Sequence, residues 1–188
     1  MPRRRDPRRR GFSLVELMIS AALSGMILAG VLSAFLFLGR SGANIQNYND
    51  MEAQARKALE VFAEDTRQAS SVTWNSDVSL TMIVDGANVT YAYSSTSNSF
   101  TRVVGSTKTT LLTGIIPPTS GNPFFRAYTI TGTEITDFST AAARTTANNT
   151  TKQVQISLRA SRTTTTVSTA TNTVLSARFV LRNKHVTA

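Results

Sequence analysis

The chain of 188 residues suggests one domain, or one small domain with an appendage. Its formal net charge of +9 is concentrated at the start, where residues 1–11 hold six arginines and one aspartate; the remaining charges are scattered without a basic stripe, which argues against nucleic-acid binding. The absence of cysteine excludes disulfides, zinc–thiolate sites and thiol nucleophiles.

Residues 12–39 predict a membrane-spanning helix. Glu16 is their only charge, and the 23 uncharged residues that follow it span about 35 Å as a helix, enough to cross a bilayer core of about 30 Å. The arginines before it place that end in the cytoplasm, so the chain after Arg40 should lie outside the inner membrane. A cleavable signal peptide has a shorter apolar core, and a plain signal anchor does not explain Glu16. A carboxylate in hydrocarbon usually marks function, although Glu16 at a shallow depth would reach headgroup water.

The segment around Glu16 carries a resemblance to a known family. Residues 10–20, RGFSLVELMIS, closely resemble the N-terminus of type IV pilins and type II secretion pseudopilins. The resemblance implies that prepilin peptidase cuts after Gly11 and methylates the new N-terminal Phe12. It also implies that Glu16, at the fifth mature position, pairs with the N-terminal amine of a neighbouring subunit, since a buried charge is tolerable only when paired. Gly11, without a side chain, lets the backbone approach the peptidase's catalytic groups.

The apolar helix carries a stripe of small residues, spaced four apart, that favours close helix packing in a filament core. The alternative is ordinary transmembrane composition. Major pilins usually have a proline near the position of Ser33, so its absence favours the minor pilin and pseudopilin classes. The stripe consists of Ala21, Gly25, Ala29 and Ser33.

An amphipathic helix is predicted from about residue 44 to 70. Apolar residues recur at helical spacing on one face and charged residues on the other, so the apolar face should cover a sheet. The glycines at 39 and 42 could kink the helix between its membrane and amphipathic halves. The face comprises Tyr48, Met51, Ala55, Ala58 with Leu59, Phe62 and Ala69, with Thr66 filling its gap.

From residue 78 the apolar period becomes two. Alternation over 78–84 and 89–93, around the turn signal at 85–88, predicts a β-hairpin. The sequence predicts two further short strands, Phe100–Val104 and Thr109–Leu112, and then a loop over 115–123. A second hairpin around Gly132 is predicted from residues 124–131 and 133–138.

The last fifty residues are rich in Thr, Ser and Ala. Residues 139–152 lack apolar alternation, which predicts a loop. Strands are predicted at 154–159 and about 174–182, and a mobile loop between them at 162–173. The element order, one long helix followed by antiparallel strands, predicts an α+β pilin-like roll.

The residues for catalysis are missing from this sequence. The only histidine, His185, lies three residues from the C-terminus, and neither a phosphate-binding loop nor a His/carboxylate metal cluster is present. Some pseudopilins bind calcium through a carboxylate-rich C-terminal loop, but residues 139–173 contain no Asp or Glu. We therefore expect neither an enzyme nor a metal or cofactor site.

The resulting hypothesis is a minor pilin or pseudopilin of a type IV pilus or type II secretion pseudopilus. Residues 1–11 would be the cleaved leader, 12–39 the transmembrane and filament-core helix, and 40–188 the soluble head. The resemblance implies prepilin peptidase, other pilins, the inner-membrane platform protein and the assembly ATPase as partners. The alternative is an uncleaved, signal-anchored extracytoplasmic binding or adhesin module.

Overall fold

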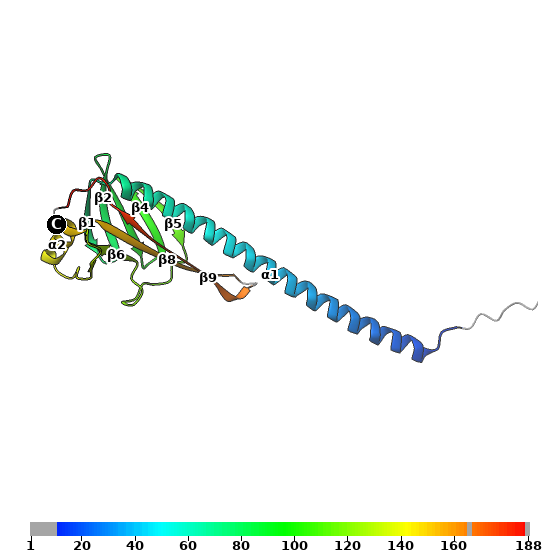
Figure 1. The fold of residues 1–188 in the computed structure, drawn as a ribbon. Coiled ribbons are helices and arrows are strands. Elements are labelled where there is room, and N and C mark those ends of the chain that lie inside the picture. The colour runs from blue at the N-terminus through cyan, green and yellow to red at the C-terminus, as the bar shows by residue number, and fades with distance from the viewer. Residues whose placement is uncertain (1–10, 165–166, 187–188) are drawn as a thin grey trace, which may run out of the picture. The chain divides into compact units, whose positions relative to one another are not determined.

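The computed structural model describes residues 11–164 and 167–186. The chain forms two compact units, the first ending at Ala43 and the second beginning at Asn44, and each is described by itself. The predicted α+β, pilin-like fold is confirmed: a long N-terminal helix is followed by antiparallel sheets (Figure 1).

Helix α1 spans Leu14–Gln68 and has no break at Gly39 or Gly42. In the second unit its apolar face is buried as predicted, at Met51, Ala55 and Phe62 and their neighbours on that face. Tyr48 is the exception at 41% exposed, so the buried part of the face starts one turn later than the sequence pattern does.

Sheet A is an antiparallel meander of five strands in the order β1-β2-β3-β4-β5. The predicted hairpin is β2–β3, and its turn places Asp85 and Gly86 at φ 49° and 79°, the left-handed pair that a two-residue hairpin turn requires. The two short strands predicted after it are β4 and β5, whereas β1 was not predicted. The strands are β1 Ser71–Ser76, β2 Ser79–Val84, β3 Ala87–Ser94, β4 Ser99–Val104 and β5 Thr107–Thr113.

Sheet B has four antiparallel strands in the order β7-β6-β8-β9. The second predicted hairpin exists as β6–β7, with shorter strands than expected and Gly132 at φ 86° in its turn. The strands predicted at 154–159 and 174–182 are the cores of β8 and β9. The strands are β6 Phe125–Tyr128, β7 Glu134–Ile135, β8 Gln153–Thr164 and β9 Val167–Val180.

The predicted loop at 162–173 is wrong over its described residues. β8 and β9 continue to pair through this stretch, with Ser161 opposite Asn172 and Arg162 opposite Thr171; the register then shifts, and Thr164 lies opposite Val167. Backbone pairing between the two strands extends the hairpin although the sequence shows no apolar alternation there, because threonine suits strand geometry.

The predicted loop at 139–152 is also wrong, because helix α2 occupies Ala141–Thr150. Thr140 caps it by accepting a hydrogen bond from the Ala143 N–H at 3.1 Å. The helix is fixed to sheet A by side chains: the Trp74 backbone N–H donates to Asn148 Oδ1 at 2.6 Å, and the Trp74 indole donates to Thr151 Oγ1 at 3.0 Å.

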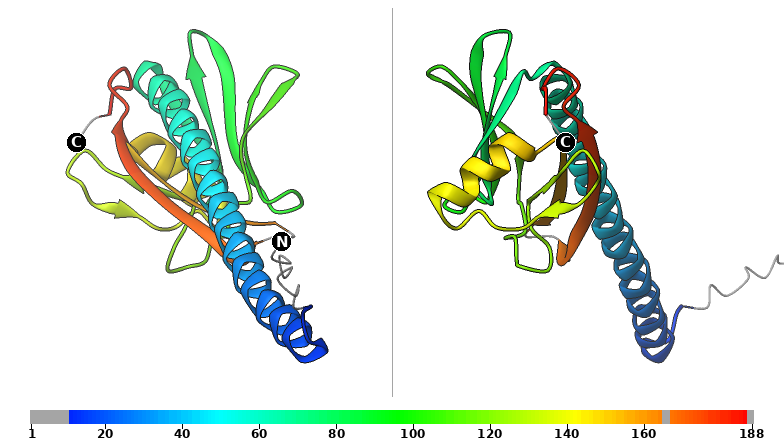
Figure 2. Two further views of the ribbon diagram at one scale, coloured as in Figure 1. Left: turned by 90° about the vertical axis from the view of Figure 1, so that its right-hand side faces the viewer. Right: turned by 60° about the vertical axis from the view of Figure 1, so that its left-hand side comes forward.

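The core of the second unit is centred on Phe62 of α1. Its ring contacts Tyr91 and Phe100 of sheet A and Phe125 and Phe179 of sheet B, with centroid separations of 5.0 to 6.3 Å. The cyan and teal part of α1 therefore lies between the green strands of sheet A and the orange-red β9 (Figure 2). The amphipathic half of α1 covers both sheets, where the sequence predicted one.

A buried polar network adds to this apolar contact. Asp65 Oδ2 accepts hydrogen bonds from the Tyr91 hydroxyl at 2.6 Å and from Arg102 Nε at 2.8 Å. Burial first, and then the hydrogen bond to Asp65, raise the pKa of the Tyr91 hydroxyl, while the hydrogen bond to Asp65 raises the pKa of Arg102. The network ties α1 to β3 and β4 by an ion pair with little solvent access.

Candidate functional site

The start of α1 is closed by a reciprocal cap between Ser13 and Glu16. The Glu16 backbone N–H donates to Ser13 Oγ at 3.2 Å, while the Ser13 N–H and hydroxyl donate to Glu16 Oε2 at 2.9 and 3.1 Å. This is a capping box, which satisfies N–H groups that the first turn of a helix leaves free. The other oxygen of Glu16, Oε1, has no hydrogen-bond partner within residues 11–164 and 167–186.

Gly11 and Phe12 precede this cap in non-helical backbone. Phe12 is 85% exposed, and a Cβ built on Gly11 would meet no heavy atom within 4 Å. The described chain itself therefore does not require glycine at position 11. A requirement for glycine there would have to come from a second molecule that closes on the backbone.

The apolar part of α1 is exposed along its length. Within the described residues, α1 is the one helix long and apolar enough to cross a membrane, and its most apolar window has a mean hydropathy of 2.2 and is 0% buried. Large side chains such as Met26 and Phe37 are 78% and 72% exposed. An apolar surface of this length needs lipid or other helices as its surroundings.

The predicted small-residue stripe lies on this exposed helix. Ala21, Gly25, Ala29 and Ser33 are all exposed, and a Cβ on Gly25 would meet nothing within 4 Å. The stripe is thus free of contacts within the described chain and open to a second helix. Its role in packing stays a prediction.

A large cleft of the second unit lies beside the C-terminal segment. It has a volume of about 790 Å³ and is lined by Ser70–Thr73, Asn148, Asn149 and residues 184–186. The buried Lys184 ammonium donates to the carbonyl oxygens of Asn148 and Thr151 at 2.5 and 2.7 Å. Desolvation by burial, and then the nearby Lys152, lower its pKa to about 8. These bonds hold the C-terminal segment against the end of α2.

This cleft offers no catalytic pair in the part of the chain that the structure describes. His185 lines it, but no serine or carboxylate hydrogen bonds to its ring there. The described residues also contain no group of three or more His, Cys, Asp or Glu side chains that could hold a metal ion. The contacts of Lys184 are structural, because its ammonium is occupied by backbone carbonyls.

The fold and the exposed apolar start together define a pilin-like protein. Residues 6–32 match the family described as the prokaryotic N-terminal methylation motif, which is the signature of type IV pilins and pseudopilins. This motif supports a type IV pilin-like protein that is processed by prepilin peptidase and assembles with other pilins. No curated protein matches the chain.

Sequence reasoning found Glu16 but missed its partner. The spacing Ser13–Glu16 has the S-x-x-E form of a capping box, so the signal was present in the sequence. The predicted partner, a neighbour's N-terminal amine, belongs to a second subunit, and that pairing stays a prediction. In the chain by itself the carboxylate serves the helix start.

Proposed function

We propose that this chain is a prepilin, cleaved after Gly11 and N-methylated at Phe12, and that it serves as a minor pilin or pseudopilin. The observation that carries the proposal is the methylation motif at residues 6–32, which ends within an exposed apolar helix. Within it Glu16 occupies the fifth position counted from Phe12. The fold supports a structural subunit, since a long N-terminal helix followed by antiparallel sheets is the pilin-like architecture.

The mature N-terminus would act in assembly through charge. Cleavage creates an ammonium at Phe12 beside an apolar helix, and a charge in that surrounding needs a partner. Glu16 of a neighbouring subunit supplies it. Oε1 of Glu16 is available for this role while Oε2 remains in the cap with Ser13. The stripe of Ala21, Gly25, Ala29 and Ser33 would then let neighbouring helices approach closely.

The proposed location of each part of the chain rests on the same residues. We place residues 1–11 as a leader in the cytoplasm, 12–39 across the inner membrane, and 40–188 as the head outside it, because arginines flank the N-terminal side of the span. From there the subunit would pass into a type IV pilus or a type II secretion pseudopilus. The partners in this step are the platform protein and the assembly ATPase.

The test is the mass of the N-terminus. The full chain is expressed in cells with and without a prepilin peptidase, and the N-terminal peptide is identified by mass spectrometry. The proposal expects a chain that begins at Phe12 with one added methyl group, and only where the peptidase is present. A chain that keeps Met1 in peptidase-containing cells refutes processing and supports the uncleaved signal-anchored module instead.

A further inference from the structure

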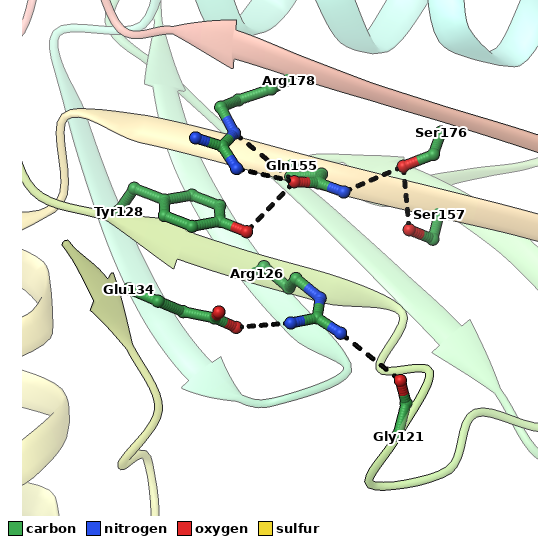
Figure 3. Close-up of polar contacts among 8 residues, drawn as sticks. All are labelled: Gly121, Arg126, Tyr128, Glu134, Gln155, Ser157, Ser176 and Arg178. Atoms are coloured by element: carbon green, nitrogen blue, oxygen red, sulfur yellow. Dashed lines mark hydrogen bonds and ion pairs between the residues drawn. The ribbon is translucent and has the colours of Figure 1, made fainter. Parts of the chain in front are cut away.

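One row of side chains crosses the outer face of sheet B. Arg126 of β6 lies opposite Gln155 of β8, which lies opposite Arg178 of β9. The three side chains point to the same side of the sheet (Figure 3). The opposite face is the core, since Val154 and Ile156, which flank Gln155, are fully buried.

Arg178, near the β9 edge, is held in place without a carboxylate. Its guanidinium lies 3.5 Å from the centroid of the Tyr128 ring, and its Nε and Nη2 donate to Gln155 Oε1 at 3.4 and 3.2 Å. Gln155 is itself fixed, because its Nε2 donates to Ser176 Oγ at 2.9 Å (Figure 3). In the described part of the chain, no acidic group forms an ion pair with Arg178. An arginine ordered in this way loses little conformational freedom when it meets an acid.

Three acids lie near the opposite edge of the same sheet: Asp77 of the β1–β2 turn, Glu134 and Asp137. Two arginines lie there with them, Arg126 and also Arg144, whose Nη1 donates to the Phe138 and Ser139 carbonyl oxygens. Glu134 of β7 is paired with Arg126 at 2.8 Å, which neutralises that arginine. Asp77 lines a cleft of about 360 Å³ together with Glu134, and a second cleft of about 280 Å³ together with Asp137. Asp77 is exposed, and no ion pair to it occurs within the described residues. Beside β7 there is thus an acid, Asp77, without an ion pair in the described residues, and on β9 a base, Arg178, without one.

The sequence repeats this separation of charge. Residues 139–188 contain no Asp or Glu but hold seven basic residues, Arg144, Lys152, Arg159, Arg162, Arg178, Arg182 and Lys184. All four acids that follow β1 in the chain, Asp77, Asp85, Glu134 and Asp137, precede this stretch. This separation along the chain is not fully one of surfaces, because Lys184 is buried and Arg144 donates to the Phe138 and Ser139 carbonyl oxygens beside Asp137; Arg178 on β9 is an exposed base that has no ion pair in the described chain.

The surroundings of Arg178 favour a protein over a nucleic acid as its partner. Single-stranded nucleic acids bind by stacking bases on open aromatic rings. Tyr128 is only 6% exposed, since Arg178 covers it, so no ring face is available there. By contrast, Val174 and Val180 on the same strand are 62% and 46% exposed, and a central arginine with apolar neighbours is typical of protein interfaces.

We propose that the β9 edge of sheet B, centred on Arg178, docks the β7 edge of a second copy of this chain, with Asp77 as the group that meets the arginine. The two surfaces differ and lie on opposite edges of one sheet. The contact is therefore head-to-tail, and it can repeat from copy to copy along a filament. The inference goes beyond the proposed function and does not depend on cleavage at Gly11.

Disulfide trapping in membranes tests the contact on the full chain, which has no cysteine of its own. Two differently tagged copies are co-expressed, one with Val180→Cys beside Arg178 and one with Thr136→Cys, an exposed position that lines both acidic clefts. The expected result is a mixed disulfide dimer. Its yield should exceed, by about fivefold or more, the yield with Thr107→Cys on β5 in place of Thr136→Cys, a ratio that corresponds to roughly 1 kcal/mol.

Charge variants identify the pair. Arg178→Glu in the Val180→Cys copy should lower the yield about fivefold, and Asp77→Lys in the other copy should restore it. Lys108→Glu, the same charge reversal on sheet A, should leave the yield unchanged. If Arg178→Glu folds poorly, Arg178→Gln takes its place. This variant keeps hydrogen-bonding capacity but removes the charge, and it should also lower the yield.

Three results overturn the inference. They are equal trapping at Thr136→Cys and Thr107→Cys, trapping unaffected by both Arg178 variants, and disulfides formed only with other proteins. The N-terminal mass is recorded on the same samples. Failure of processing at Gly11 is thereby distinguished from failure of the contact.

Discussion

The ion pair between Asp65 and Arg102 provides the sharpest test of how α1 is joined to sheet A. We predict that Asp65→Asn destabilises the head. The change keeps the shape of the side chain but removes the negative charge that Arg102 Nε meets at 2.8 Å and that the Tyr91 hydroxyl meets at 2.6 Å. Arg102 then remains as a partly buried cation without its partner.

The size of this destabilisation follows from how far the two side chains are buried. The side chain of Asp65 is 9% exposed and that of Arg102 is 28% exposed. Removing one partner from a fully buried pair costs about 3–5 kcal/mol, and the solvent access of Arg102 lowers this to roughly 2–3 kcal/mol. Residues 44–188 should unfold with an entropy of about 0.3 kcal/mol/K, so Tm should fall by about 8 °C.

Trp74 supplies the assay, because it is the single tryptophan of the chain and is 2% exposed in the core of the second unit. Thermal unfolding of the detergent-solubilised full chain is followed by its fluorescence for Asp65→Asn, Arg102→Gln and the double variant. The double variant should cost less than the sum of the two, by more than about 1 kcal/mol, because neither charge is left alone. A shift below about 2 °C for Asp65→Asn, or strict additivity, would refute the assigned role of this pair.

Three further predictions concern the N-terminal segment and the core. Glu16→Ala should leave cleavage intact, because the peptidase acts before Phe12, but should abolish incorporation into filaments; normal incorporation, measured on sheared fibres, would contradict the pairing of Glu16 with an amine. Gly11→Val should lower the cleaved fraction at least about tenfold, since a penalty of about 1.4 kcal/mol in binding to the peptidase suffices. Gly11 has open space in this chain, so the variant should fold as the parent does, and a lowered folding stability of the variant would point to misfolding instead. The raised pKa of Tyr91 means that the folded state keeps the phenol proton above pH 10, where the unfolded chain releases it, so the unfolding free energy should fall as pH rises from about 10. Tyr91→Phe should remove that part of the pH dependence in urea titrations, and an unchanged slope would contradict the burial of the hydroxyl.

The elements predicted correctly from the sequence are those whose apolar period matches their packing. The alternation at residues 78–93 gave the β2–β3 hairpin because one face of each strand is buried: Leu80, Met82, Val89 and Tyr91 are at most 2% exposed. The same holds for the face of α1 that begins at Met51. In these elements the apolar residues that follow the period lie on the buried face, whereas Ile83, which is out of phase with it, is 38% exposed.

The missed elements depend on partners that are distant in sequence. Helix α2 buries essentially one apolar side chain, Ala147, and its amphipathic pattern is therefore weak. Its position is set by Asn148 and Thr151, which bond Trp74 more than seventy residues away. Strand β1 was missed for the same reason, since only Val72 and Trp74 face the core. The Thr140 cap and the S-x-x-E cap at Ser13 were readable in the sequence, because caps are local.

The cap at Ser13 changes the account of the acid in the apolar segment. Sequence alone presents Glu16 as a charge that needs a partner from outside. The structure gives it two donors from Ser13, both on Oε2, within the same turn. If assembly required Glu16 to abandon this cap, each docking event would have to replace two hydrogen bonds at the helix start. Because Oε1 has no partner in the described chain, an incoming ammonium can bind there while the cap persists. If Glu16 pairs with a neighbour's N-terminus as proposed, the same carboxylate would still hold the first turn of the helix, and its orientation would be set before the second subunit arrives.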